Sequence, residues 1–162
     1  MSRLDSAIRR LEAQRDCLAL AAELIKNLTG PVLELGLGNG RTFDHLRSLM
    51  PGREIFVFDR QLAAHPDCIP DAKHAIVGDF TETLPTALAR TGELAVLAHC
   101  DTGSGDRAAT SAQASWLAEP VNNLVCSGGI IVSDQAFEYP GWIALDLPET
   151  VSPGRYFIYR KS

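Results

Sequence analysis

Polar side chains that can do chemistry stand at or near the ends of several predicted strands. In a parallel sheet the carboxyl ends of the strands lie along one edge, so we expect these side chains to gather there. Carboxylates accept hydrogen bonds from hydroxyl and amino groups of a ligand, and an acid or a histidine can also act as a general base. The set consists of Glu34, Asp59, Asp79, His99, Asp101 and Asp134. No catalytic residue stands out, and the candidates are His99, Asp101 and Asp134.

A glycine-rich loop follows the first predicted strand, in the run Glu34-Leu35-Gly36-Leu37-Gly38-Asn39-Gly40. Glycine lets the backbone turn sharply and approach a ligand closely. The helical pattern that follows leaves free backbone N–H groups, which favour an anionic group of the ligand. A dinucleotide-binding fingerprint would need a third glycine at position 41, which is Arg41, so a nicotinamide cofactor is disfavoured.

Two acidic positions further along the chain indicate an adenosine. Asp59 lies 23 positions after Gly36 (59 − 36), where a carboxylate can accept two hydrogen bonds from a ribose diol. Asp79 and Phe80 follow the next strand, where an acid can accept from the exocyclic amine of adenine while an aromatic ring packs on the base. The loop and these residues together predict a ligand that contains adenosine.

The elements that must position these residues alternate between strands and helices. Five apolar segments and a closing hairpin predict an α/β fold, with a Rossmann-like, doubly wound sheet that is mostly parallel. Helical patterns cover residues 81–90 and about 107–125, and Pro120 would kink the second. The expected strands are 32–35, 55–58, 75–77, 94–98 and 130–133, and the antiparallel hairpin covers 142–147 and 155–160.

The N-terminal segment, residues 1–29, reads as one helix or two, and it ends at Thr29-Gly30-Pro31. Ser2 and Asp5 have the spacing of a capping box. We expect residues 1–162 to form a single domain in which this segment precedes an α/β core of residues 30–162.

Composition narrows the function classes. The net charge is −5 among 162 residues, which disfavours nucleic acid as a partner. No run of apolar residues is long enough to span a membrane, and the charged N-terminus does not resemble a signal peptide. The four cysteines are far apart, which is typical of reduced thiols and predicts a cytoplasmic protein without a disulfide framework or zinc site.

The ordered motifs resemble those of class I, Rossmann-like S-adenosylmethionine-dependent methyltransferases, of which this chain would be a small, minimal member. The resemblance covers about residues 30–161 and includes the reversed last strand of that fold. It is carried by the glycine loop, by Asp59, by Gly78-Asp79-Phe80 and by the run from Gly128 to Asp134.

The resemblance implies S-adenosylmethionine as the cofactor and a set of residues that bind it. The glycines would lie beneath the methionine part, with Glu34 supporting the loop and His99 near the transferred methyl group. The full set is Glu34, Gly36, Gly38, Asn39, Gly40, Arg41, Thr42, Asp59, Arg60, Gln61, Gly78, Asp79, Phe80 and His99. His99 could instead be a hydrogen-bonded core histidine, and Asp59 and Asp134 could be residues of strand-end turns.

The acceptor is expected to be a small molecule. Only a short segment separates Asp134 from the last predicted strand, which leaves little room for substrate-covering inserts. The site would then be open, or completed by the N-terminal helix or by a second subunit of a homo-oligomer. The Asn/Asp-Pro-Pro-Tyr/Phe motif of amino-directed nucleic-acid methyltransferases does not follow His99.

Two alternative functions remain. One is a non-catalytic module that binds S-adenosylmethionine or S-adenosylhomocysteine. The other is a Mg²⁺-dependent, catechol-type O-methyltransferase, whose metal ligands would correspond to Asp101, Asp134 and Gln135. We predict no metal site, because Asp101 lies two residues past His99 and glutamine stands where that family prefers asparagine.

Overall fold

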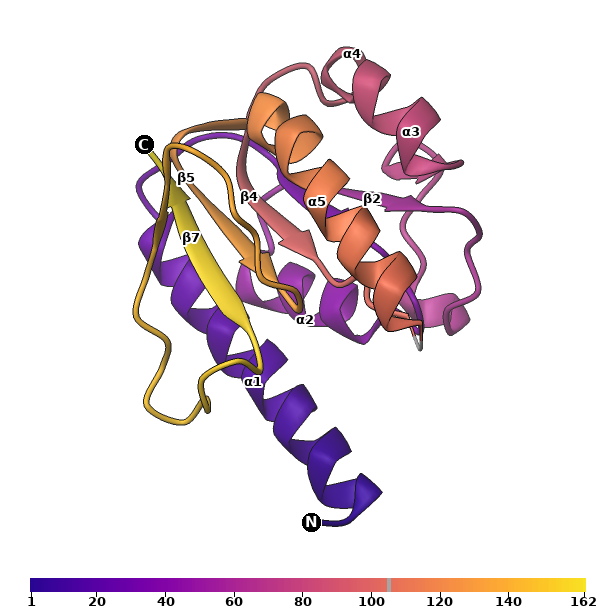
Figure 1. The fold of residues 1–162 in the computed structure, drawn as a ribbon. Coiled ribbons are helices and arrows are strands. Elements are labelled where there is room, and N and C mark those ends of the chain that lie inside the picture. The colour runs from indigo at the N-terminus through magenta and orange to yellow at the C-terminus, as the bar shows by residue number, and fades with distance from the viewer. Residues whose placement is uncertain (105) are drawn as a thin grey trace.

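The computed structural model describes residues 1–104 and 106–162, and a seven-stranded sheet lies at its centre (Figure 1). The strand order is β3-β2-β1-β4-β5-β7-β6. The strands are β1 (Val32–Leu35), β2 (Ile55–Asp59), β3 (Ala75–Val77), β4 (Ala95–Cys100), β5 (Val125–Ser133), β6 (Trp142–Ala144) and β7 (Phe157–Lys161). β1 to β5 pair in parallel, whereas β7 is antiparallel to both of its neighbours. This topology confirms the predicted fold class.

The helices are α1 (Arg3–Leu24), α2 (Arg41–Leu49), α3 (Phe80–Thr83), α4 (Ala87–Thr91) and α5 (Arg107–Leu124), with short 3₁₀ turns at Pro66–Cys68 and Leu84–Thr86. α1 is one continuous helix, and its predicted capping box is present: the N–H of Asp5 donates to Ser2 Oγ over 3.0 Å. The helix expected over residues 81–90 is divided into α3, a 3₁₀ turn and α4. Pro85 lies in that turn and has no N–H to continue an α-helical ladder.

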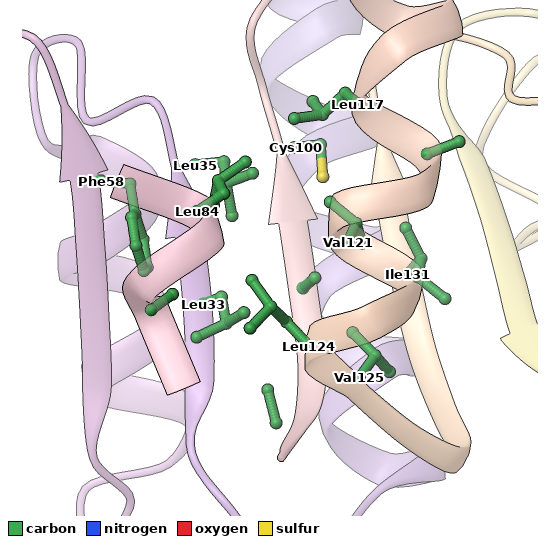
Figure 2. Close-up of a cluster of buried hydrophobic side chains, with 14 of the residues drawn as sticks. Leu33, Leu35, Phe58, Leu84, Cys100, Leu117, Val121, Leu124, Val125 and Ile131 are labelled. Carbon is green, nitrogen blue, oxygen red and sulfur yellow. The ribbon is translucent and has the colours of Figure 1, made fainter. Parts of the chain in front are cut away.

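Helices cover both faces of the sheet and form two apolar layers. On one face, α5 and the α3–α4 segment pack on Leu33, Phe58 and Ile131, as Figure 2 shows. On the other face, α1 and α2 pack on residues such as Val57 and Val132. The central strands are buried on both faces, which explains their nearly uninterrupted apolar sequence.

β5 begins earlier than the sequence pattern predicts. Gly128 and Gly129, expected in a turn, lie inside the strand, next to a shift of register between Ala95 and Leu97 of β4. Such an irregularity accommodates glycines without ending the strand.

The N-terminal half of α1 extends beyond the sheet (Figure 1). Its buried positions begin at Ala13, while Leu4, Ile8 and Leu11 are exposed. No helix in residues 1–104 and 106–162 combines the length and hydropathy needed to cross a membrane.

Candidate functional site

The loop between β1 and α2 depends on its glycines. Gly36, Gly38 and Gly40 have φ of 92°, 52° and 84°, in the left-handed region that side chains disfavour. A Cβ at Gly36 would lie 2.5 Å from the carbonyl oxygen of Asp101, and one at Gly40 would lie 2.5 Å from the Cβ of Cys68. No described atom lies within 4 Å of a Cβ built at Gly38, so this glycine borders open space.

Asp59, at the end of β2, contacts the glycine loop. Its Oδ2 accepts hydrogen bonds from the N–H of Leu37 at 2.7 Å and of Gly38 at 3.3 Å. The N–H of Gln61 lies 3.4 Å from its Oδ1. Asp59 therefore joins the loop to the end of β2 and presents a carboxylate beside Gly38.

Asp79, after β3, caps α3. Its Oδ1 accepts from the N–H of Thr81 at 2.9 Å, and its Oδ2 pairs with Nη2 of Arg60 at 2.8 Å. The hydrogen bonds from Thr81, followed by the one from Arg60, lower the pKa of Asp79, so this side chain is a carboxylate at neutral pH.

A cavity of about 650 Å³, which we call cavity A, lies in front of these residues. One wall belongs to α5, where Ala109, Gln113 and Trp116 recur at the spacing of one helix face. This periodicity is visible in the sequence, although the three residues were not among those predicted to line a site. The remaining lining residues are Gly36, Gly38, Asp59, Arg60, Asp79, Phe80, Thr81, Asp101, Thr102, Gly103 and Ser104.

A second cavity of about 510 Å³, cavity B, lies between the glycine loop and α1. It shares Gly36, Gly38, Asp101 and Gly103 with cavity A, so the two cavities meet at these residues. Its other lining residues are Arg3, Ser6, Ala7, Arg10, Leu11, Gln14, Leu37, Asn39, Arg41, Thr42 and Arg155. The sequence indicated that the N-terminal helix could complete the site, but neither its individual lining residues nor Arg155 were predicted, because only the tertiary fold brings them to the loop.

Asp101 joins α1 to the end of β4. Its Oδ1 accepts from Nη2 of Arg10 at 2.8 Å, and its Oδ2 accepts from Nε2 of Gln14 at 2.6 Å. Both oxygens are thus bound to the helix that covers cavity B.

Asp134 holds the loop that follows β4 rather than lining either cavity. Its carboxylate accepts from the N–H of Thr102 at 3.3 Å and of Gly103 at 3.0 Å, and Gln135 Nε2 lies 3.2 Å away. Burial and then the charge of Asp101 raise the pKa of Asp134. Across residues 1–104 and 106–162, no group of three or more His, Cys, Asp and Glu side chains is arranged to hold a metal ion.

His99 and Glu34 lie in the core beneath the loop. Nδ1 of His99 is 2.7 Å from Oε2 of Glu34, and its Nε2 is 2.8 Å from the hydroxyl of Tyr156. The other oxygen of Glu34 accepts from Thr42 at the start of α2. His99 thus occupies the position of a hydrogen-bonded core histidine, the alternative that the sequence left open.

The structure gathers most of the residues expected at the cofactor around the two cavities. Those that line them are Gly36, Gly38, Asn39, Arg41, Thr42, Asp59, Arg60, Asp79 and Phe80. Glu34, Gly40, Gln61, Gly78 and His99 line neither cavity and lie behind or beside the loops that do.

Comparison with known proteins shows which family this chain resembles. A family model described as S-adenosyl-L-methionine methyltransferase matches residues 1–161. An S-adenosyl-L-methionine methyl transferase from Silicibacter pomeroyi is 43% identical, with a TM-score of 0.94, and the match covers 100% of this chain and 99% of that one. A search of curated proteins returned no match.

More distant structures share the fold alone. A putative caffeoyl-CoA O-methyltransferase from Staphylococcus aureus is 12% identical, with a TM-score of 0.60, and the match covers 90% of this chain and 82% of that one. Human N-acetylserotonin methyltransferase, in complex with S-adenosylmethionine, is 18% identical, with a TM-score of 0.58, and the match covers 92% of this chain and 51% of the human one.

Proposed function

The chain belongs to the S-adenosyl-L-methionine methyltransferase family, and from that premise we propose that it transfers a methyl group to a small-molecule acceptor. The size and position of cavity B support a small molecule as the acceptor. This cavity holds about 510 Å³, is covered by α1, and meets cavity A at Gly36, Gly38, Asp101 and Gly103. A cavity of this size beside the cofactor site fits a small molecule.

Cavity A fits the adenosine part of the cofactor. Asp59 would accept hydrogen bonds from the ribose hydroxyls beside Gly38, where no side chain fills the space. Asp79 would accept from the adenine amino group, and Phe80 and Trp116 offer apolar surface for the base. On the cavity B side, Asn39 and Arg41 would bind the methionine carboxylate near the N-terminus of α2.

The main contribution of the protein to the reaction would be to position the acceptor atom against the methyl group. When bound, S-adenosylmethionine supplies a methyl group that its sulfonium has already activated for in-line displacement. The junction of the cavities would hold the acceptor atom in line with that group. Of the three catalytic candidates, Asp101 alone lines the cavities, and we assign it the role of orienting the acceptor or taking its proton.

Calorimetric titration with S-adenosylmethionine, S-adenosylhomocysteine and NAD tests the cofactor. We expect both sulfur compounds to bind more tightly than NAD, and the reverse order would overturn the assignment. Turnover is then measured with methyl-labelled S-adenosylmethionine and a panel of small hydroxy, amino and thiol compounds. Binding without any transfer would favour a non-catalytic binding module.

A chelator tests the Mg²⁺-dependent alternative. Asp101 is held by Arg10 and Gln14, and Asp134 is held by backbone N–H groups, so metal binding would have to displace these partners. We expect turnover to be unchanged in EDTA. A loss that added Mg²⁺ restores would favour the metal-dependent mechanism.

We also propose a cytoplasmic homo-oligomer. Leu4, Ile8 and Leu11 are 69%, 45% and 43% exposed on neighbouring turns of α1, which supports contact with a second copy. The four cysteines are free thiols, as expected in a reducing compartment. Light scattering of the protein and of an Ile8→Glu variant tests the assembly, and a monomeric wild type would contradict it.

A further inference from the structure

Cavity B carries a concentration of positive charge, from which we propose that the acceptor is an anion: a small molecule with a carboxylate or phosphate group that arginine side chains bind. The inference deepens the proposed methyl transfer and rests on it. It concerns the acceptor alone, because cavity A accounts for the adenosine part of the cofactor.

The charge in cavity B contrasts with the charge of the whole chain. Four of the fifteen lysine and arginine residues line this cavity, namely Arg3, Arg10, Arg41 and Arg155. The net charge of the chain is −5, and Asp101 is the one acidic side chain among the described lining residues. The excess of positive charge is therefore local to this cavity.

One of the four arginines has a partner in the structure, and the bound cofactor would supply a partner for a second. Arg10 is paired with Asp101 at 2.8 Å, so these two charges offset each other. Arg41 lies beside the glycine loop, where the methionine carboxylate of the cofactor would neutralise it. Arg3 and Arg155 remain, and neither forms an ion pair with any described carboxylate.

Arg3 and Arg155 come from distant parts of the chain. Arg3 is the first residue of α1, and Arg155 lies just before β7. Nη1 of Arg155 is 3.4 Å from the hydroxyl of Ser6, which lies on α1 one turn after Arg3. The fold thus brings Arg155 to the first turn of α1, and both arginines line cavity B.

A guanidinium group can form paired, charge-assisted hydrogen bonds to a carboxylate or a phosphate. Two such groups in one partly enclosed cavity repel each other unless an anion lies between them. A neutral acceptor would leave that repulsion between the two arginines in place. Cavity B should therefore bind an anionic acceptor more tightly than a neutral one. The reactive atom of the acceptor would then extend toward the junction at Gly36 and Asp101, where the methyl group is expected.

Anion binding can be measured without knowledge of the acceptor. The protein is first saturated with S-adenosylhomocysteine, so that the methionine carboxylate site is filled, and is then titrated at low salt with inorganic phosphate and, separately, with acetate. Amide resonances report where each anion binds. The variants are Arg3→Gln, Arg155→Gln and the double variant, and the matched control is Arg9→Gln, an exposed arginine of α1 that does not line cavity B.

We expect saturable binding of at least one anion, with a dissociation constant that rises about fivefold or more in each single variant and is unchanged in Arg9→Gln. Tighter phosphate binding would indicate a phosphorylated acceptor, and tighter acetate binding a carboxylate. Absence of saturable binding by both anions, or equal weakening in Arg9→Gln, would overturn the proposal.

A turnover assay separates this inference from the proposed function. The acceptor panel is arranged in pairs, each an acid or phosphate ester beside its neutral amide or dephosphorylated form. Transfer to the anionic members, with a raised KM in Arg155→Gln, supports both proposals. Preferential transfer to the neutral members would contradict the proposal of an anionic acceptor but would still support methyl transfer. Arginine-dependent anion binding without any transfer contradicts methyl transfer instead.

Discussion

Glu34 and His99 face each other across the central strands β1 and β4, where they are register partners. Nδ1 of His99 lies 2.7 Å from Oε2 of Glu34, and neither side chain has exposed surface. Thr42 extends this pair to the start of α2, and Tyr156 extends it to the segment that precedes β7. The buried network therefore links the helix that follows the glycine loop to the segment before β7, on the face of the sheet that α1 and α2 cover.

The stabilising effect of this network should depend on pH. Burial, the largest influence, lowers the pKa of His99, but the charge and hydrogen bond of Glu34, together with the charges of Asp101 and Asp134, prevail, so the pKa of His99 is raised above 6.5. A raised pKa means that the stabilisation is fully present below the unfolded value of 6.5 and is lost as the pH rises through the folded value.

We therefore expect His99→Gln to reduce the free energy of unfolding by about 2 kcal/mol near pH 6, the size of a charge-assisted hydrogen bond, and by less at alkaline pH. Urea denaturation at several pH values measures the difference. His65→Gln is the control, because the His65 side chain is 68% exposed. A difference that stays constant from acid to alkaline pH would contradict a charged His99.

Asp59→Ala should weaken the binding of S-adenosylmethionine by roughly 1–3 kcal/mol, because it removes the expected ribose contact. The same change frees the N–H groups of Leu37 and Gly38, so part of the loss comes from the loop. Calorimetry measures both S-adenosylmethionine and S-adenosylhomocysteine. Asp67→Ala, with a side chain that is 85% exposed, should bind as the wild type does. Unchanged affinity in Asp59→Ala would exclude the ribose role.

Apolar strands and strand-end residues were readable from the sequence because they depend on local pattern. The run Ile55-Phe56-Val57-Phe58 is buried as expected, and the acids at the end of β2 and after β3 line cavity A. The start of β5 was predicted wrongly because Gly128 and Gly129 were expected in a turn. A register shift in the pairing with β4 keeps these glycines within the strand.

Tertiary partners could not be read in the same way. Gln14 and Asp101 are 87 positions apart, and nothing in the local sequence of either residue indicates their hydrogen bond. His99 was ambiguous for the same reason, since its role depends on Tyr156, which a distant loop brings beneath the site. The arginines of cavity B likewise appear as a cluster only in the folded chain.

Gln14→Leu should loosen the N-terminal half of α1. Gln14 is 6% exposed, and its Nε2 is 2.6 Å from Asp101 Oδ2, so leucine retains the packing volume but loses the hydrogen bond. We expect faster amide hydrogen exchange in residues 3–14 and a severalfold higher KM for the acceptor, with little change in cofactor affinity. Gln113→Leu, which alters cavity A, should weaken cofactor binding and leave the amide exchange of α1 and the KM for the acceptor nearly unchanged. Wild-type exchange of α1 in Gln14→Leu would show that the hydrogen bond does not hold the helix.

Gly103→Ala should impair the site through steric conflict. A Cβ at Gly103 would collide with Oδ2 of Asp134 and approach Gln135 Nε2 to 3.1 Å, and its backbone does not have a positive φ that would add strain. Because Gly103 lines both cavities, displacement of its loop should lower kcat/KM at least tenfold, about 1.4 kcal/mol or more in transition-state stabilisation.

Gly52→Ala is the matched control for that experiment, since no described atom lies within 4 Å of its Cβ position and its φ is not positive, and it should leave kcat/KM unchanged. A second variant isolates the conflict with Asp134. If the collision causes the defect, Gly103→Ala should lower kcat/KM much less in the Asp134→Ala background than in the wild type, because the carboxylate is no longer present. Equal losses in the two backgrounds would show that Asp134 is not what requires glycine at position 103.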